Sequence, residues 1–162
     1  MDKNMSANTF GGKTVAISGG FDPIHFGHVE MMQEAKALGD RLVVIVNNDN
    51  WLKAKKGFAF MPEQERIAII QAIKYVDDVV LTKHELNTKD ISICSELEEL
   101  KPDIFANGGD RKPDGDPIPE VELCNRLGIK LVYNIGKSGK IQSSSDLVKR
   151  AREIKGLPEK KF

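Results

Sequence analysis

The chain has 162 residues, and its 24 lysine and arginine residues balance 24 aspartate and glutamate residues. This length suits one α/β domain and is too short for two full domains. A formal net charge of zero gives no reason to expect binding to nucleic acid or to an anionic membrane, so any anion site must be local. No apolar stretch is long enough to cross a bilayer and no signal-like series opens the chain, which predicts a cytoplasmic protein.

Apolar runs and helical periodicities alternate along the chain. The expected strands span residues 13–18, 42–46, 76–81, 102–106 and 129–135, and the expected helices span 29–38, 62–73, 90–100, 118–127 and 143–150. This alternation with short links predicts a parallel sheet with helices on both faces. One domain is expected over residues 13–155, with flexible tails at 1–12 and 156–162.

Two segments carry more specific expectations. Residues 51–60 show little core pattern and read most simply as a basic loop. In the helix expected over 90–100, the periodicity places Ile91 inward and Glu96 outward. His84 follows a strand in a polar stretch and is expected to be a surface histidine. No metal site is predicted from side chains, because Cys94 and Cys124 lack partners at metal-ligand spacing.

The stretch from Ser18 to His28 follows the first strand and leads into the first helix. Gly19 and Gly20 allow the backbone to approach a ligand closely, and the helix N-terminus favours a phosphate. His25 and His28 lie at the same end, where both imidazoles can donate hydrogen bonds to a polyphosphate. The alternative is one buried histidine bonded to a carbonyl and one histidine on the surface.

A second candidate phosphate site comes near the end of the chain. Ser143, Ser144 and Ser145 precede an apolar pair that starts a helix, and Lys140 lies shortly before them. One serine is needed as the helix cap. The remaining hydroxyls and the free amides of the helix start are suited to binding the β- and γ-phosphates of a nucleotide.

The string Gly20-Phe21-Asp22-Pro23-Ile24-His25-Phe26-Gly27-His28 resembles the HxGH signature of the small nucleotidylyltransferases. The serine run resembles the second signature of the same family. The resemblance implies a single Rossmann-like domain with five parallel strands in the order 3-2-1-4-5. It also implies transfer of a nucleotidyl group from CTP or ATP, carried with Mg²⁺, to a phosphorylated small molecule with release of pyrophosphate. A homodimer is expected from the family, and no nucleic acid or membrane partner is expected.

The resemblance also implies roles for individual residues. The catalytic residues would be His25, His28 and Lys56. The nucleotide-binding residues would be Gly19, Gly20, Phe21, Asp22, Gly27, Gly109, Asp110, Ser143, Ser144 and Ser145. Contacts to the acceptor or to phosphates would come from Lys53, Lys55, Arg66, Asn107 and Lys140. Arg66 could equally pair with a carboxylate, and Asn107 stands where the heptose-phosphate enzymes commonly have a lysine.

The substrates remain open at this point. The motifs look most like heptose-1-phosphate adenylyltransferases and glycerol-3-phosphate cytidylyltransferases, so the main expectation is a sugar or polyol phosphate as acceptor. The archaeal FAD synthetases, which take FMN, resemble the region from Ser144 into the last helix. A nucleotide-binding sensor that does no chemistry is the alternative outside enzymes, although both histidines, the lysines and the serines are all present.

Overall fold

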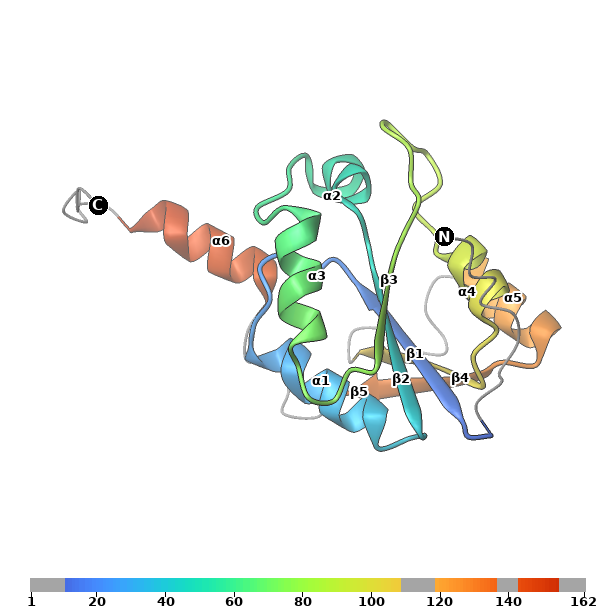
Figure 1. Ribbon diagram of the computed structural model, residues 1–162. Coiled ribbons are helices and arrows are strands. Elements are labelled where there is room, and N and C mark those ends of the chain that lie inside the picture. The colour runs from blue at the N-terminus through green and yellow to red at the C-terminus, as the bar shows by residue number, and fades with distance from the viewer. Residues whose placement is uncertain (1–10, 109–118, 137–142, 155–162) are drawn as a thin grey trace.

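A computed structural model describes residues 11–108, 119–136 and 143–154 (Figure 1). Five parallel strands form one sheet in the order β3-β2-β1-β4-β5, with β1 at the centre. The strands are β1 (Thr14–Gly19), β2 (Arg41–Val46), β3 (Asp78–Leu81), β4 (Ile104–Gly108) and β5 (Lys130–Ile135). The predicted α/β class and strand order are confirmed.

The helices are α1 (Phe26–Lys36), α2 (Asp49–Lys56), α3 (Glu63–Gln71), α4 (Cys94–Leu100), α5 (Pro119–Leu127) and α6 (Ser144–Glu153). Helices α1 and α3 cover one face of the sheet and α4 and α5 cover the other, whereas α6 extends away from the sheet (Figure 1). Met32 of α1 and Ile70 of α3 are buried in one core, whereas Leu97 of α4 and Leu123 of α5 are buried in a second core on the opposite face. No helix in the described part of the chain is long and apolar enough to cross a membrane.

Strand β2 shows why the sheet needs both layers. All of its residues from Leu42 to Val46 are fully buried. Side chains alternate across a strand, so Val44 packs into the α1 and α3 core and Ile45 packs into the α4 and α5 core. A continuous apolar run is therefore what a strand covered on both faces requires.

The segment predicted as a basic loop contains a helix, α2, so that prediction is wrong for residues 51–56. The Asn48 side chain caps the helix by accepting a hydrogen bond from the Trp51 amide at 2.9 Å. Leu52 is fully buried, and Gly57 ends the helix with a φ of 85°. The sequence contained the capping residue, the single buried apolar residue and the glycine that ends the helix. A helix of two turns is too short for hydrophobic periodicity to reveal it.

The helix expected over 90–100 begins only at Cys94. Asp90 stabilises a non-helical backbone ahead of Cys94. Its side chain accepts a hydrogen bond from the Ser92 amide at 2.9 Å, and its carbonyl accepts one from the Thr88 hydroxyl at 2.8 Å. Two face assignments were wrong. Ile91 lies before the helix and is 43% exposed. Glu96 lies within the helix but is buried, and its carboxylate accepts from the Lys83 amide at 3.2 Å.

Arg66 of α3 joins four segments around the carboxyl end of β2. Its guanidinium is fully buried. It donates to the carbonyls of Gly20 and Asn47 at 2.7 and 2.6 Å, to the Met61 carbonyl at 2.9 Å, and to the Asp49 carboxylate at 2.6 Å. A buried charge with this many partners fixes the relative positions of the turn after β1, the start of α2 and the start of α3.

We expect Arg66→Met to lower the free energy of unfolding by about 3–5 kcal/mol, because it leaves the Asp49 carboxylate and three carbonyls without their donor. The matched control is Arg126→Met, which removes an ion pair to Glu98 whose side chains are 67% and 59% exposed. That control should cost less than about 1 kcal/mol. Urea denaturation measures both values. Equal losses in the two variants would contradict the role given to Arg66.

Candidate active site

The turn after β1 lies at the centre of the carboxyl edge of the sheet. A Cβ atom on Gly20 would approach the Leu52 side chain to 2.9 Å, so only glycine allows α2 to pack this close to the turn. Phe21 adopts a φ of 52° and is buried beneath the turn. Its ring contacts His28 edge-on, with the ring centroids 5.0 Å apart.

His25 and His28 form a reciprocal cap at the start of α1. The His25 Nδ1 atom accepts a hydrogen bond from the Gly27 amide at 3.1 Å, and the His28 Nδ1 atom accepts one from the His25 amide at 3.2 Å. The two rings stack with centroids 3.9 Å apart. A Cβ atom on Gly27 would lie 3.0 Å from the His25 ring, which explains the glycine between the histidines.

These bonds set the tautomer of both rings. A backbone N–H can only donate, so each Nδ1 carries no proton, and each neutral ring holds its proton on Nε2. Burial lowers the pKa of His25. Burial, then the charges of His25 and Lys56, lower the pKa of His28 to about 3. At neutral pH both histidines are therefore neutral Nε2–H donors, suited to the oxygens of a phosphate.

The side chain of Asp22 is used inside the protein. It is buried, and its two oxygens accept from the Phe60 and Met61 amides at 2.7 and 2.6 Å. These bonds hold the segment between α2 and α3 against the turn. The predicted nucleotide contacts of Gly19, Gly20, Phe21 and Asp22 remain predictions for the backbone of this turn, since the Phe21 and Asp22 side chains already have protein partners.

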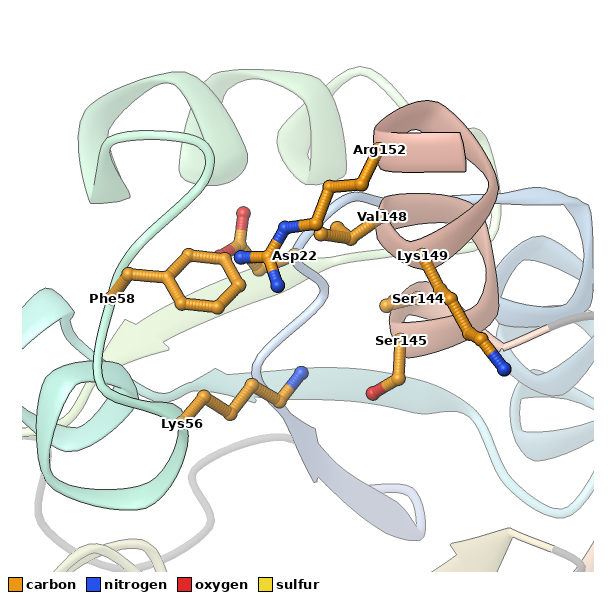
Figure 2. A pocket seen from close by; sticks show the side chains of 8 residues that line it. All are labelled: Asp22, Lys56, Phe58, Ser144, Ser145, Val148, Lys149 and Arg152. Atoms are coloured by element: carbon orange, nitrogen blue, oxygen red, sulfur yellow. The ribbon is translucent and has the colours of Figure 1, made fainter. Parts of the chain in front are cut away.

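A cavity of about 250 Å³ opens beside the turn, between the segment after α2 and helix α6 (Figure 2). Its lining residues are Asp22, Lys56, Phe58, Ser144, Ser145, Val148, Lys149 and Arg152. The lining carries three basic side chains and two hydroxyls beside one carboxylate, that of Asp22, whose oxygens accept from two amides. The excess of positive charge and the hydroxyls suit a polyphosphate. Figure 2 shows Lys56 reaching across the cavity toward the start of α6.

The three serines divide into distinct roles at the start of α6. Ser143 is the cap, and its hydroxyl accepts from the Asp146 amide at 3.0 Å. The Ser144 hydroxyl donates to the Pro23 carbonyl at 2.8 Å and so ties α6 to the turn after β1. Ser145 is exposed and lines the cavity. Capping and a ligand-facing hydroxyl thus coexist here, while phosphate binding itself remains a prediction.

Phe58 and Arg152 join the two walls of the cavity. The Arg152 guanidinium lies 5.3 Å from the centre of the Phe58 ring, a cation–π contact between the segment after α2 and helix α6 (Figure 2). Neither residue was predicted from the sequence, nor was Lys149. A usable signal was present, because Ser145, Lys149 and Arg152 stand four and seven residues apart and share one face of a helix.

The remaining predicted site residues differ in their placement. Lys53, Lys55 and Lys56 are exposed on α2, but of the three only Lys56 lines the cavity. The Lys55 ammonium lies 5.3 Å from the Trp51 ring. Arg66 pairs with Asp49, which is the alternative stated for it, and its contact to a substrate remains a prediction.

Asn107 is buried in β4 at the same edge of the sheet. Its contact to the acceptor remains a prediction. Gly109, Asp110 and Lys140 lie outside the described residues, as do most of the two predicted tails. In the part of the chain that the structure describes, no three His, Cys, Asp or Glu side chains are placed to hold a metal ion.

The low pKa of His28 makes folding stability depend on pH. A histidine in the unfolded chain has a pKa near 6.5, whereas folded His28 has one of about 3. Between these values the unfolded chain binds a proton that the folded chain does not, so stability falls as the pH is lowered through this window. The slope from this group is up to about 1.4 kcal/mol per pH unit.

His28→Asn keeps an acceptor near the position of Nδ1 and removes the titrating group. We expect the free energy of unfolding of the wild type to fall relative to that of this variant as the pH is lowered from 7 to 4. Urea denaturation at each pH measures the difference. A difference that does not change with pH would show that His28 is not held neutral by the fold.

Comparisons with known proteins identify the family of this chain. The cytidylyltransferase-like family model matches residues 16–133. A protein named FAD synthase from Pyrococcus horikoshii is 42% identical over 119 residues, which cover 73% of this chain and 77% of that protein. A second FAD synthase, from Thermoplasma volcanium, is 36% identical over 147 residues, which cover 88% of this chain and 96% of that protein.

Two further relatives carry other names. The bifunctional protein HldE from Streptomyces coelicolor is 35% identical over 147 residues, which cover 88% of this chain and 29% of that protein. A crystal structure described as the lipopolysaccharide core biosynthesis protein from Thermoplasma volcanium superposes with a TM-score of 0.63 and 30% identity, over 76% of this chain and 97% of that one. With its fold, its paired histidines and these relatives, the chain belongs to the cytidylyltransferase-like family of nucleotidyltransferases.

Proposed function

We propose that this protein is an FMN adenylyltransferase, which transfers AMP from MgATP to the phosphate of FMN and releases FAD and pyrophosphate. The family supplies the reaction class. The name FAD synthase, carried by relatives that align over most of their length, supports FMN as the acceptor. The comparisons favour this alternative over the main expectation from sequence, which was a sugar or polyol phosphate.

The reaction is a substitution at the α-phosphorus of ATP. An oxygen of the FMN phosphate forms the new P–O bond, and the bond from the α-phosphorus to the bridging oxygen of pyrophosphate breaks. The attacking oxygen carries no proton, so no general base is needed. The difficulty is to bring two anions together in line, which positioning and preorganised hydrogen-bond donors overcome.

The observation that carries this proposal is the pair of Nε2–H donors on His25 and His28. Their Nδ1 atoms are bound to backbone amides, so both rings are fixed before substrate arrives. Placed at the α-phosphate, the two donors stabilise the charge that grows on its oxygens and on the leaving group. Because the rings stay neutral, they do so without exchanging a proton with the substrate.

The cavity beside the histidines suits the leaving group. Lys56, Lys149 and Arg152 surround it together with the Ser145 hydroxyl. We assign the β- and γ-phosphates of MgATP to this cavity, where positive side chains oppose their charge. Mg²⁺ would arrive with the nucleotide as part of the substrate. A homodimer remains an expectation from the family.

A second candidate is adenylyl transfer to a sugar phosphate, which the similarity to HldE favours. The two candidates share ATP and differ in the acceptor.

Pyrophosphate release should be measured with ATP or CTP and with FMN, a heptose phosphate or glycerol 3-phosphate. We expect release with ATP and FMN, together with FAD detected by chromatography. Release with the heptose phosphate and none with FMN would establish the second candidate instead, and binding of ATP without any release would indicate a sensor.

His28→Asn also tests the mechanism. We expect kcat to fall by about a hundredfold or more, because the variant lacks the Nε2–H donor at the reacting phosphate. The melting temperature should stay close to that of the wild type at pH 7, since the asparagine oxygen can still accept from the His25 amide. Activity within about tenfold of the wild type would contradict the role of His28.

A further inference from the structure

The turn with His25 and His28 follows the central strand, β1. The cavity assigned to the leaving phosphates is lined by this turn, by Lys56 and Phe58 at and after the end of α2, and by α6. An in-line attack requires the acceptor to approach from the side opposite the leaving group. The start of α2 borders the turn, and neither it nor the loop bound to it contributes a residue to that cavity. We therefore take the start of α2 and the loop between β3 and α4 as candidates for the acceptor side.

Trp51 of α2 occupies this side of the turn. A Cβ atom on Gly20 would lie 3.7 Å from Cζ3 of its ring, which places the edge of the indole directly at the catalytic turn. The ring is half-buried, and its Nε1–H donates to the Ile91 carbonyl at 2.8 Å. The neighbouring Leu52 fills the core position, so Trp51 is not needed to fill that core.

The loop between β3 and α4 lies near α2 (Figure 1), and hydrogen bonds join the two. The side-chain amides of Asn48 and Asn50 both donate to the His84 carbonyl, at 2.8 and 3.0 Å. The His84 ring bridges the Thr82 hydroxyl and the Ser92 carbonyl, each at 2.8 Å. His84 therefore links two parts of the loop through its ring. The expectation of a surface histidine with no obvious partner was wrong.

These bonds hold the Trp51 ring in place. One side-chain N–H of Asn48, one of Asn50 and the Nε1–H of Trp51 bind the loop. The loop exposes Leu86 at 66% and Ile91 at 43% beside charged side chains such as Lys89, and the Lys55 ammonium lies 5.3 Å from the centre of the Trp51 ring. A flat aromatic acceptor needs a fixed aromatic or apolar surface, and Trp51 supplies one beside the catalytic turn.

We propose that Trp51, held by the Ile91 carbonyl, is the surface against which the isoalloxazine ring of the acceptor stacks. The electron-rich indole pairs with the electron-poor flavin, and the position of Trp51 at Gly20 directs the acceptor phosphate toward the two histidines. Trp51 is then a determinant of acceptor specificity. This inference rests on the proposed function, since it requires FMN to be the acceptor.

Trp51 is the single tryptophan of the chain, so its fluorescence reports the binding of FMN near this residue, and the variants below test the contact itself. We expect FMN to quench the tryptophan emission of the wild type beyond the absorption effect measured with free N-acetyltryptophanamide. Glycerol 3-phosphate should leave the emission unchanged. The dissociation constants of FMN and ATP are then measured by calorimetry for the wild type and each variant.

Trp51→Leu should weaken FMN binding by about tenfold or more, the range expected for loss of a stacked aromatic ring. Trp51→Phe keeps a ring but not the Nε1–H, and should stay within about threefold of the wild type. ATP affinity should be unchanged in both. The matched control is Tyr75→Leu. Tyr75 precedes β3, and its ring also has a lysine beside it, because the Lys74 ammonium lies 4.9 Å from the ring centre. This control should leave FMN binding unchanged.

Three results would overturn the inference. If Trp51→Leu binds FMN as the wild type does while FAD is still formed, the proposed function stands and the role of Trp51 is wrong. If both Trp51 variants lose ATP and FMN binding equally, Trp51 is only structural. If the wild type binds no FMN and releases pyrophosphate with another acceptor, the proposed function and this inference fail together.

Discussion

The site depends on one buried cation. Arg66 has no exposed side-chain surface, and its guanidinium reaches the carbonyls of Gly20 and Asn47 and the carboxylate of Asp49. These three residues belong to the turn that presents the histidines, the end of β2 and the start of α2. Since a buried guanidinium needs all its partners to offset its desolvation, the three segments are positioned as one unit.

The two histidines impose a second constraint on the site, in addition to the positions that Arg66 fixes. Two imidazoles stacked 3.9 Å apart repel one another when both are charged, and the nearby Lys56 adds to the same effect. The protein therefore keeps them neutral and uses them as hydrogen-bond donors. Net positive charge comes from the cavity instead, where Lys56, Lys149 and Arg152 face the place assigned to the leaving phosphates. Hydrogen-bond donors and positive charges are thus supplied by different elements.

The fold and the centre of the site could be predicted from sequence because their signals are local. The apolar run from Leu42 to Val46 reveals a strand buried on both faces, and the glycines around His25 and His28 reveal a turn at a helix start. The sequence does not decide whether Arg66 contacts a substrate or pairs with a carboxylate, because a guanidinium gives the same sequence signal in both roles. Only the fold shows which carbonyls surround it.

Contacts between distant segments could not be predicted in the same way. The pairing of Phe58 with Arg152 spans the chain, and so does the bond from Ser144 to the Pro23 carbonyl. The wall formed by α2 and the loop after β3 was missed for a different reason. Its helix has a single buried residue, and its loop is held by side-chain amides that bind a backbone carbonyl, which leaves no periodic pattern to detect.

The central claim is that His25 and His28 stand ready as neutral donors with their protons on Nε2. Two-dimensional ¹H–¹⁵N NMR of the ¹⁵N-labelled imidazoles measures the protonation of each ring nitrogen directly. The account predicts that at pH 7 both rings show an Nε2–H and an unprotonated Nδ1, and that His28 keeps this state at pH 5. An imidazolium at pH 7, or a proton on the Nδ1 of either ring, would contradict it.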